Sequence, residues 1–388
     1  MPNRAERQEL LKCDCSAYDR YPLAVSALPR SIEWFWSLIT MKPIDFLKMP
    51  LHLLSVASRE KSFVDNPIIG SPRLNRWGLH QYRITLADRL AWSRRRRLAH
   101  YLSAEDLEAY ARHGLVIKHD FLPPAVFAQV RDEAHAHVSE AREMCQGRAV
   151  TRRVTLDPVD ACQLPHCVAA ANDPRLDHLM RYVASHDVTP LMYLQIIIVD
   201  PDRGAQDPQA TLHIDTFHSI AKAWLFLQDV GDDDGPLAYI PGSHRLDEKR
   251  LAWEYAQSLV AASARNVYHA RGSFRATPED LDRLGLGPAI QVAVPANTLV
   301  VADTHGFHAR TPSARPTVRM EIYGTLRWNP YAFFWVPDPL AWPGIVSRRA
   351  TLLDDVGDLA ARLGLSGNSW PKVSARRMNS PDVGGQSS

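Results

Sequence analysis

The stretch TLHIDTFH, residues 211–218, places a histidine and an aspartate two positions apart. On a β-strand, side chains at positions i and i+2 point to the same face, so the imidazole of His213 and the carboxylate of Asp215 converge on one point. A histidine and a carboxylate arranged in this way are two of the three ligands of a facial metal-binding triad. The stretch therefore predicts a metal site that a third ligand, from another part of the chain, completes.

Candidates for the third ligand lie downstream in VVADTHGFH, residues 300–308. This stretch holds two histidines, His305 and His308, and either could reach the pair. Ten residues, 309–318, separate His308 from Arg319, which lies inside a strand-like run. An arginine in a strand can hold a carboxylate through two parallel hydrogen bonds, so this region offers an anion anchor beside the metal site.

The motifs around the pair follow one another in a specific order. The apolar run AKAWLFLQDV, residues 221–230, comes first, then GPLAYIPGSH, residues 235–244, and then the spacing from His308 to Arg319. Over roughly residues 103–329 this order resembles the phytanoyl-CoA dioxygenase family, whose members are Fe(II)- and 2-oxoglutarate-dependent oxygenases.

The resemblance implies a mainly β fold with flanking helices, built on an antiparallel double-stranded β-helix of the jelly-roll or cupin type. It implies that His213, Asp215 and His308 bind Fe(II), because the family pattern has about ten residues between the last histidine and the arginine. It further implies that 2-oxoglutarate is a co-substrate clamped by Arg319. O2 would then oxidise an unactivated C–H bond, by hydroxylation or a related oxidation, with release of succinate and CO2.

Two further residues bear on the co-substrate. The run LMYLQIIIV, residues 191–199, is apolar and rich in β-branched residues, which predicts a buried strand. Gln195 interrupts it, and a polar residue there needs a partner. It either reaches toward the co-substrate, as the resemblance implies, or is a core glutamine bonded to a neighbour. Arg315 precedes Pro316 and is expected in a loop, which favours Arg319 as the clamp.

Composition sets limits on the partners and the compartment. The chain has 388 residues, 46% of them hydrophobic, a formal net charge of +2 and five cysteines. The near-neutral balance predicts no nucleic-acid partner, and the odd, irregular set of cysteines is not a disulfide framework. No apolar signal segment opens the chain, and no run of about 18 apolar residues occurs. We expect a cytoplasmic protein that acts on a small molecule; its oligomeric state is not defined by the sequence.

Patterning divides the chain into three parts. We expect a helical N-terminal extension over 1–102 and the oxygenase domain over 103–335. Within that domain, a helical insert at 246–288 is expected to cover the site. A C-terminal extension is expected over 336–388, with a disordered tail from 374 onward. Within them we expect helices near 85–101, 104–113, 125–143, 173–185, 246–266 and 278–284, and a hairpin of 289–294 with 298–302.

The N-terminal extension leaves several interpretations open. The aromatic Trp34, Phe35 and Trp36 and the run of four arginines at 94–97 are the features concerned. The aromatics fit a segment packed over the domain, a dimer contact, or an anchor in a lipid surface, and the arginines fit either a solvated face or a phosphate-binding patch. The last combination would suit a lipid-like or phosphorylated substrate and a protein peripheral to a membrane.

A second class of function fits the same residues. A cupin-like metal-binding protein or an isomerase would need the triad but no 2-oxoglutarate. Arg319 distinguishes the two classes, since without a buried cation the co-substrate has no clamp.

Overall fold

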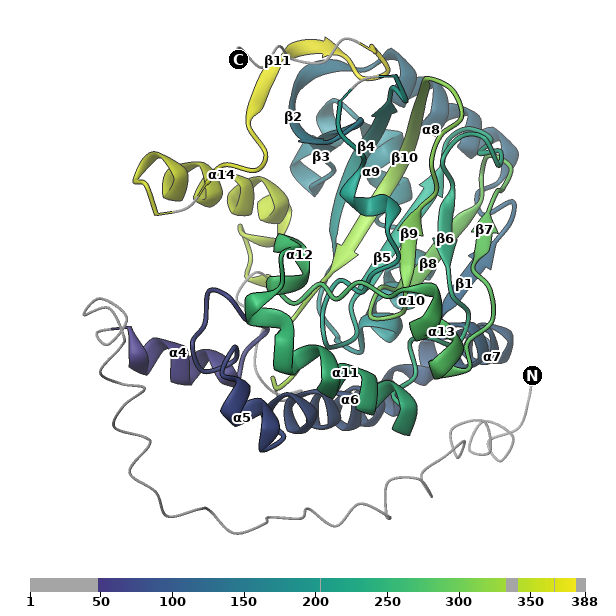
Figure 1. Cartoon of the computed structure of the whole chain (residues 1–388). Coiled ribbons are helices and arrows are strands. Elements are labelled where there is room, and N and C mark those ends of the chain that lie inside the picture. The colour runs from purple at the N-terminus through teal and green to yellow at the C-terminus, as the bar shows by residue number, and fades with distance from the viewer. Residues whose placement is uncertain (1–47, 203, 333–340, 366, 382–388) are drawn as a thin grey trace.

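The computed structural model describes residues 48–202, 204–332, 341–365 and 367–381. Two antiparallel sheets form its centre (Figure 1). The larger has the strand order β1 (Leu115–Lys118), β8 (Leu299–Asp303), β5 (Ala221–Phe226), β10 (Thr317–Leu326), β4 (Leu191–Val199), β3 (Ala149–Thr155), β2 (Val138–Gln146) and β11 (Lys372–Arg377). The smaller has the order β7 (Ile290–Val292), β6 (Leu237–Tyr239) and β9 (His308–Arg310). This is the predicted double-stranded β-helix class of fold.

Helices cover one face of the large sheet and close the end below it (Figure 1). The described α-helices are α4 (Met49–Val56), α5 (Pro72–Arg76), α6 (Leu79–Leu98), α7 (Ala104–His113), α8 (Pro124–Ala136), α9 (Pro165–Ala171), α10 (Pro174–Ala184), α11 (Glu248–Val260), α12 (Val267–Ala270), α13 (Pro278–Leu284) and α14 (Arg349–Arg362). Among the described residues, no helix has the length and hydropathy of a membrane span.

The alternation of side chains along the strands separates a dry core from a polar interior. Leu194, Ile196 and Ile322 are fully buried in the main apolar cluster, on the face that the helices cover. Their neighbours on β4 and β10 point to the opposite face, toward the small sheet. There Gln195 pairs with Glu321 in the strand register. The polar pair of β4 and β10 therefore lies between the two sheets.

The N-terminal helices pack against the insert and the site loop. A buried cluster joins Phe63 and Ile69, which precede α5, to Trp253 of α11, Phe274 and Ile214. Ile214 lies between the two residues of the metal-binding pair. The described part of the extension thus supports the loop that carries the pair.

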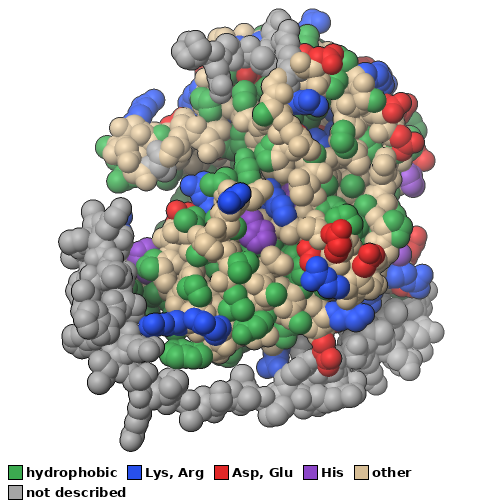
Figure 2. All heavy atoms as spheres, viewed as in Figure 1, with side chains coloured by type: hydrophobic (Ala, Val, Ile, Leu, Met, Phe, Trp, Pro, Cys, Tyr) green, Lys and Arg blue, Asp and Glu red, His purple; other side chains and the backbone are tan. Residues whose placement is uncertain are grey.

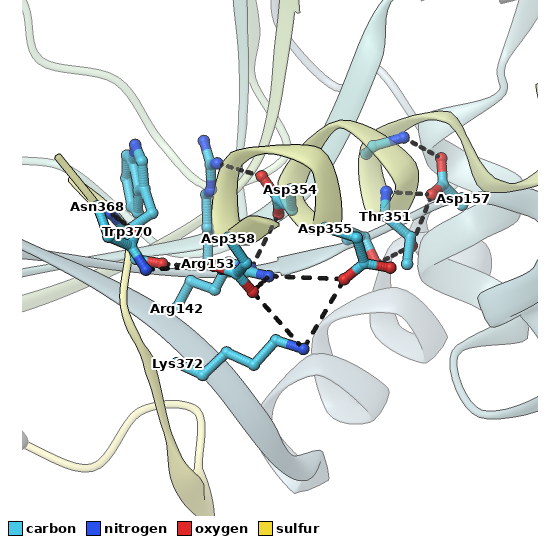
Figure 3. Close-up of polar contacts among 12 residues, drawn as sticks. Arg142, Arg153, Asp157, Thr351, Asp354, Asp355, Asp358, Asn368, Trp370 and Lys372 are labelled. Atoms are coloured by element: carbon cyan, nitrogen blue, oxygen red, sulfur yellow. Dashed lines mark hydrogen bonds and ion pairs between the residues drawn. The ribbon is translucent and has the colours of Figure 1, made fainter. Parts of the chain in front are cut away.

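The C-terminal segment docks on the outer strands of the large sheet (Figure 3). Arg142 of β2 contacts Asp358 through two hydrogen bonds of 2.8 and 2.7 Å, and Arg153 of β3 contacts Asp354 at 2.8 Å. The carboxylate of Asp157 accepts hydrogen bonds from backbone amides at the first turn of α14. The prediction of disorder from residue 374 is wrong as far as 377, because these residues pair with β2 in strand β11.

Other local predictions divide into confirmed and wrong ones. The buried strand over Leu191–Val199, the helix over Pro278–Leu284 and the helix that follows Ser103 are confirmed. The helix expected near 85–101 begins at Leu79 instead, so the capping pattern at Thr85 lies inside it.

Two predicted elements fail because of tertiary pairing. The helix expected over 125–143 ends at Ala136, and β2 follows, since β3 and β11 hydrogen-bond to it from both sides. The predicted hairpin around residues 295–297 is wrong as well. β7 pairs with β6 in the small sheet, while β8 pairs with β1 and β5 in the large one. Asn297, in the left-handed region at φ 62°, turns the chain from one sheet to the other.

Candidate metal centre

Backbone hydrogen bonds bring His213 and His308 opposite each other. The amide of each donates to the carbonyl of the other, at 3.0 Å in both directions. Such a reciprocal pair is the hydrogen-bonded pair of two antiparallel strands, so both side chains leave the backbone at the same level. We expected the stretch 211–218 to be a β-strand, but it is not a regular one. Its residue His213 forms isolated β-bridges to His308 and to Arg275. The amide of Asp215 is held by the Thr304 carbonyl at 2.9 Å.

The three side chains meet at one point. The ligand atoms of His213, Asp215 and His308 all lie within 4.8 Å of one another, and such a group could hold a metal ion. The Asp215 carboxylate is 3.9 Å from Nε2 of His213 and 3.7 Å from Nε2 of His308. The two imidazole rings are 4.4 Å apart between centroids.

Hydrogen bonds fix which nitrogen of each ring faces the shared point. Nδ1 of His213 lies 2.8 Å from the Thr211 carbonyl, and Nδ1 of His308 lies 3.0 Å from the Gly306 carbonyl. A carbonyl only accepts, so Nδ1 carries the proton and Nε2 keeps its lone pair. Burial lowers the pKa of both imidazoles, that of His213 well below its usual value, so both rings are neutral near pH 7.

A lysine completes the charge balance of the centre. Nζ of Lys222, on β5, is 2.6 Å from Oδ2 of Asp215. Burial alone would raise the pKa of Asp215, but the interactions around it, led by the charge of Lys222, outweigh burial and hold that pKa well below its usual range. The carboxylate is therefore charged and available as a ligand.

A second polar group lies further along the same interior face. Nη1 of Arg319 donates to the Gly235 carbonyl at 2.7 Å, and its Nε donates to Glu321 at 3.2 Å. Gln195 donates to the other oxygen of Glu321 at 2.7 Å. Arg310, two residues beyond His308, bonds to Asp207 at 2.8 Å. The structure thus brings Arg319 and Gln195 together around Glu321.

A family model described as phytanoyl-CoA dioxygenase matches residues 110–309, more than half of the chain. The chain belongs to the phytanoyl-CoA dioxygenase family. No curated protein matches it.

Solved structures with a similar fold are distant from this phytanoyl-CoA dioxygenase family member. HygX from Streptomyces hygroscopicus, with nickel and 2-oxoglutarate bound, shares 18% identity over 63% of this chain and 94% of that chain, with a TM-score of 0.38. AviO1 from Streptomyces viridochromogenes Tue57 shares 18% over 62% and 96%, with a TM-score of 0.37. The epimerase SnoN from nogalamycin biosynthesis shares 19% over 56% and 80%, with a TM-score of 0.38.

Two residues that the sequence offered as alternatives, His305 for the third ligand and Arg315 for the clamp, lie outside the site of this phytanoyl-CoA dioxygenase family member. Nδ1 of His305 lies 2.9 Å from the Thr216 carbonyl, and the residue is outside the three-ligand group. Arg315 is exposed and pairs with Asp234 at 2.6 Å, whereas Arg319 is buried.

Both interpretations of the four-arginine run are wrong for its first half. Arg94 and Arg95 are buried in α6. Arg94 donates to the carbonyls of Ser185 and Pro330, and Arg95 donates to Asp303 and to carbonyls at the end of α10. Their charges hold helices and sheet together, so neither is free for solvent or phosphate. The aromatic segment at 34–36 lies outside the described residues.

The sequence analysis missed Lys222, Arg310 and Lys61. The sequence could have marked Lys222, because it is the one charged residue of an otherwise apolar strand and shares a face with Trp224. Arg310 stands two residues from His308 and so shares its face. No local pattern marks Lys61, whose Nζ donates to the Asp215 carbonyl at 2.5 Å from a distant segment.

Proposed function

We propose that this protein is an Fe(II)- and 2-oxoglutarate-dependent oxygenase that oxidises an unactivated C–H bond of a small molecule, by hydroxylation or a related oxidation. One observation supports this most strongly. Nε2 of His213 and Nε2 of His308 are buried without a hydrogen-bond partner, and both lie close to the Asp215 carboxylate, which Lys222 holds from one side. A buried acceptor without a donor is costly, and a divalent cation beside the Asp215 carboxylate removes that cost for both nitrogens.

The donor set fits iron. Two neutral imidazoles and one carboxylate on adjacent backbone segments are the facial ligand set of non-heme Fe(II) oxygenases. When bound, Fe(II) with 2-oxoglutarate and O2 supplies the oxidising power for C–H cleavage and releases succinate and CO2. The protein orients the ligands: the Thr211 and Gly306 carbonyls hold the rings, and Lys222 holds the carboxylate in its charged form.

Arg319 is the proposed clamp for the far carboxylate of 2-oxoglutarate. It is buried on the interior face of β10, and Gly235 and Glu321 fix its guanidinium plane. A fixed plane loses little entropy when it takes up a second carboxylate in the two-pronged geometry. Gln195 acts through Glu321, which it holds from the other side. Arg310 contributes a second cation near Arg319 that offsets the charge of Glu321.

The competing function is a metal-binding protein or isomerase that uses no 2-oxoglutarate. It is favoured by one contact, since Glu321 already supplies Arg319 with a carboxylate partner. A lipid-like substrate at a membrane surface loses support, because half of the basic run that would hold it there is buried.

The test is metal-dependent turnover in a matched pair of histidine variants. We expect the wild-type protein, with Fe(II), O2 and ascorbate as reductant, to convert 2-oxoglutarate to succinate, and Fe(II) to raise its unfolding temperature. His308→Ala removes a ligand and should lose both effects. His305→Ala removes a buried histidine outside the group and should keep both. Equal loss in the two variants, or no succinate from the wild type, would refute the assignment.

A further inference from the structure

Three cationic side chains from distant parts of the chain surround the metal-binding pair. Lys61 lies between α4 and α5, Arg275 follows α12, and Arg327 follows β10. The backbone of Arg275 bridges to that of His213, and Lys61 bonds to the Asp215 carbonyl. Figure 2 shows Lys, Arg and His side chains gathered at the centre of one face of the molecule.

The three cations lack carboxylate partners within the described residues. Neither Lys61, Arg275 nor Arg327 forms an ion pair within 4.0 Å there, although Asp215 attracts all three from further away. Glu60, the other acidic residue close by, uses its carboxylate to accept the backbone amides of Lys61 and Ser62. The positive charges of Arg275 and Arg327 repel that of Lys61. Such repulsion raises the free energy of the folded protein unless an anion offsets it.

Two of the cations also carry unused donors. Nε of Arg275 and Nε of Arg327 are buried and have no hydrogen-bond partner. The other nitrogens of Arg275 are held by Ser273 and the Pro208 carbonyl, and Nη2 of Arg327 is held by the Arg59 carbonyl. Both guanidinium groups are thus held in place with a donor left over, as expected of groups that receive an oxygen ligand.

This cluster is separate from the proposed co-substrate clamp. Arg319 and Arg327 are eight residues apart along β10 and its continuation. At about 3.3 Å per residue, their backbones are about 26 Å apart. Lys222, which contacts Asp215, pairs with Thr325, so the metal-binding group lies near the Arg327 end of the strand. Competition between phosphate and 2-oxoglutarate decides whether the anion at the cluster is a different molecule.

We propose that Lys61, Arg275 and Arg327 bind an anionic group, carboxylate or phosphate, of the molecule that is oxidised. This rests on the proposed function for the word oxidised, but the anion site itself does not depend on it. Binding the charge beside the metal-binding pair would place a carbon near that charge in reach of the reacting centre. It also defines the substrate class as small organic acids or phosphate esters, and excludes cationic molecules by repulsion.

The first experiment measures anion binding without metal or turnover. Inorganic phosphate is titrated into the metal-free protein by calorimetry, with and without excess 2-oxoglutarate. We expect one saturable site that 2-oxoglutarate does not displace, and at least tenfold weaker binding in Arg275→Gln/Arg327→Gln. Arg96→Gln/Arg265→Gln removes two exposed arginines and should bind like the wild type. No saturable binding, displacement by 2-oxoglutarate, or equal binding by both double variants overturns the proposal.

The second experiment concerns the substrate. Carboxylic acids with their methyl esters, and phosphate monoesters with their parent alcohols, are compared as stimulators of succinate release by the Fe(II)-loaded protein. We expect only the charged member of a pair to stimulate, with the preference lost in Arg275→Gln/Arg327→Gln. Stimulation by the neutral members overturns the proposal. If the protein releases no succinate at all, the proposed function fails while the phosphate titration still decides the anion site.

Discussion

Replacing Arg319 with methionine should separate its structural role from its proposed role in co-substrate binding. Both members of the Arg319–Glu321 pair are buried, with side-chain exposures of 8% and 0%. The substitution removes the 3.2 Å bond to Glu321 and the 2.7 Å bond to the Gly235 carbonyl. It leaves the Glu321 carboxylate with only the 2.7 Å bond from Gln195 among the side-chain contacts described here. Breaking a buried pair in this way costs about 3–5 kcal/mol of unfolding free energy.

A second substitution at Glu321 shows where that cost arises. In Arg319→Met/Glu321→Gln no charge remains unpaired, so we expect most of the lost stability to return, to within about 1–2 kcal/mol of the wild type. Urea unfolding of the wild type, Arg319→Met, Glu321→Gln and the double variant gives the interaction free energy between the two residues. A double variant as unstable as Arg319→Met would refute the idea that the stranded carboxylate causes the loss.

The same variants test the clamp. Two hydrogen bonds to a charged group are worth about 3 kcal/mol or more, so both proteins that lack the guanidinium should bind 2-oxoglutarate at least about a hundredfold more weakly. Arg319→Lys keeps the charge but loses the planar fork, and we expect a raised KM for 2-oxoglutarate. Unchanged co-substrate binding in the stable double variant would show that another cation, with Arg310 the nearest candidate, holds the far carboxylate.

Two further predictions concern stability. Burial opposes ionisation of Glu254, but bonds from His80 and Arg250 outweigh it and hold the pKa at about 2, below the ordinary 4.5. A depressed folded-state pKa stabilises the protein above about pH 4.5, and the contribution of about 3 kcal/mol is lost as the pH falls toward 2. Acid titration of the unfolding free energy should be flatter in Glu254→Gln, and an equally steep curve would contradict this. Asp157→Ala removes acceptors from the first turn of α14 and should cost about 1–2 kcal/mol of local stability. Hydrogen exchange of the α14 amides should speed up in this variant but not in Asp355→Ala, and equal exchange in the two would exclude the cap.

The sequence by itself determined the elements whose signal is local. The buried strand over Leu191–Val199 is confirmed because an apolar, β-branched run of this length, with Gln195 as its one polar residue, favours a buried strand. The helix over Pro278–Leu284 is confirmed because Thr277 and Asp280 form a reciprocal cap that needs only neighbouring residues. The order of motifs around His213 resembles that of the phytanoyl-CoA dioxygenase family, and this resemblance predicted the double-stranded β-helix.

Only the tertiary structure decided which distant residues lie together. The segment after Ala136 became a strand because β3 and β11 supply hydrogen-bond partners on both sides, which outweighs its weak helical pattern. Arg94 and Arg95 are buried and link segments of the fold, and they do not form a surface patch, because carbonyls from other segments accept their hydrogen bonds. Composition cannot distinguish a solvated arginine from one whose donors are all taken up inside the protein.

The cation cluster depends on tertiary structure to the greatest degree. Lys61, Arg275 and Arg327 are ordinary charged residues in three unrelated stretches, and no spacing among them signals a site. They come together because the N-terminal segment, the insert and the end of β10 all pack around the loop that carries His213 and Asp215. Charge adds up through space and not along the chain, so only the packing of those segments could bring the three cations to one place.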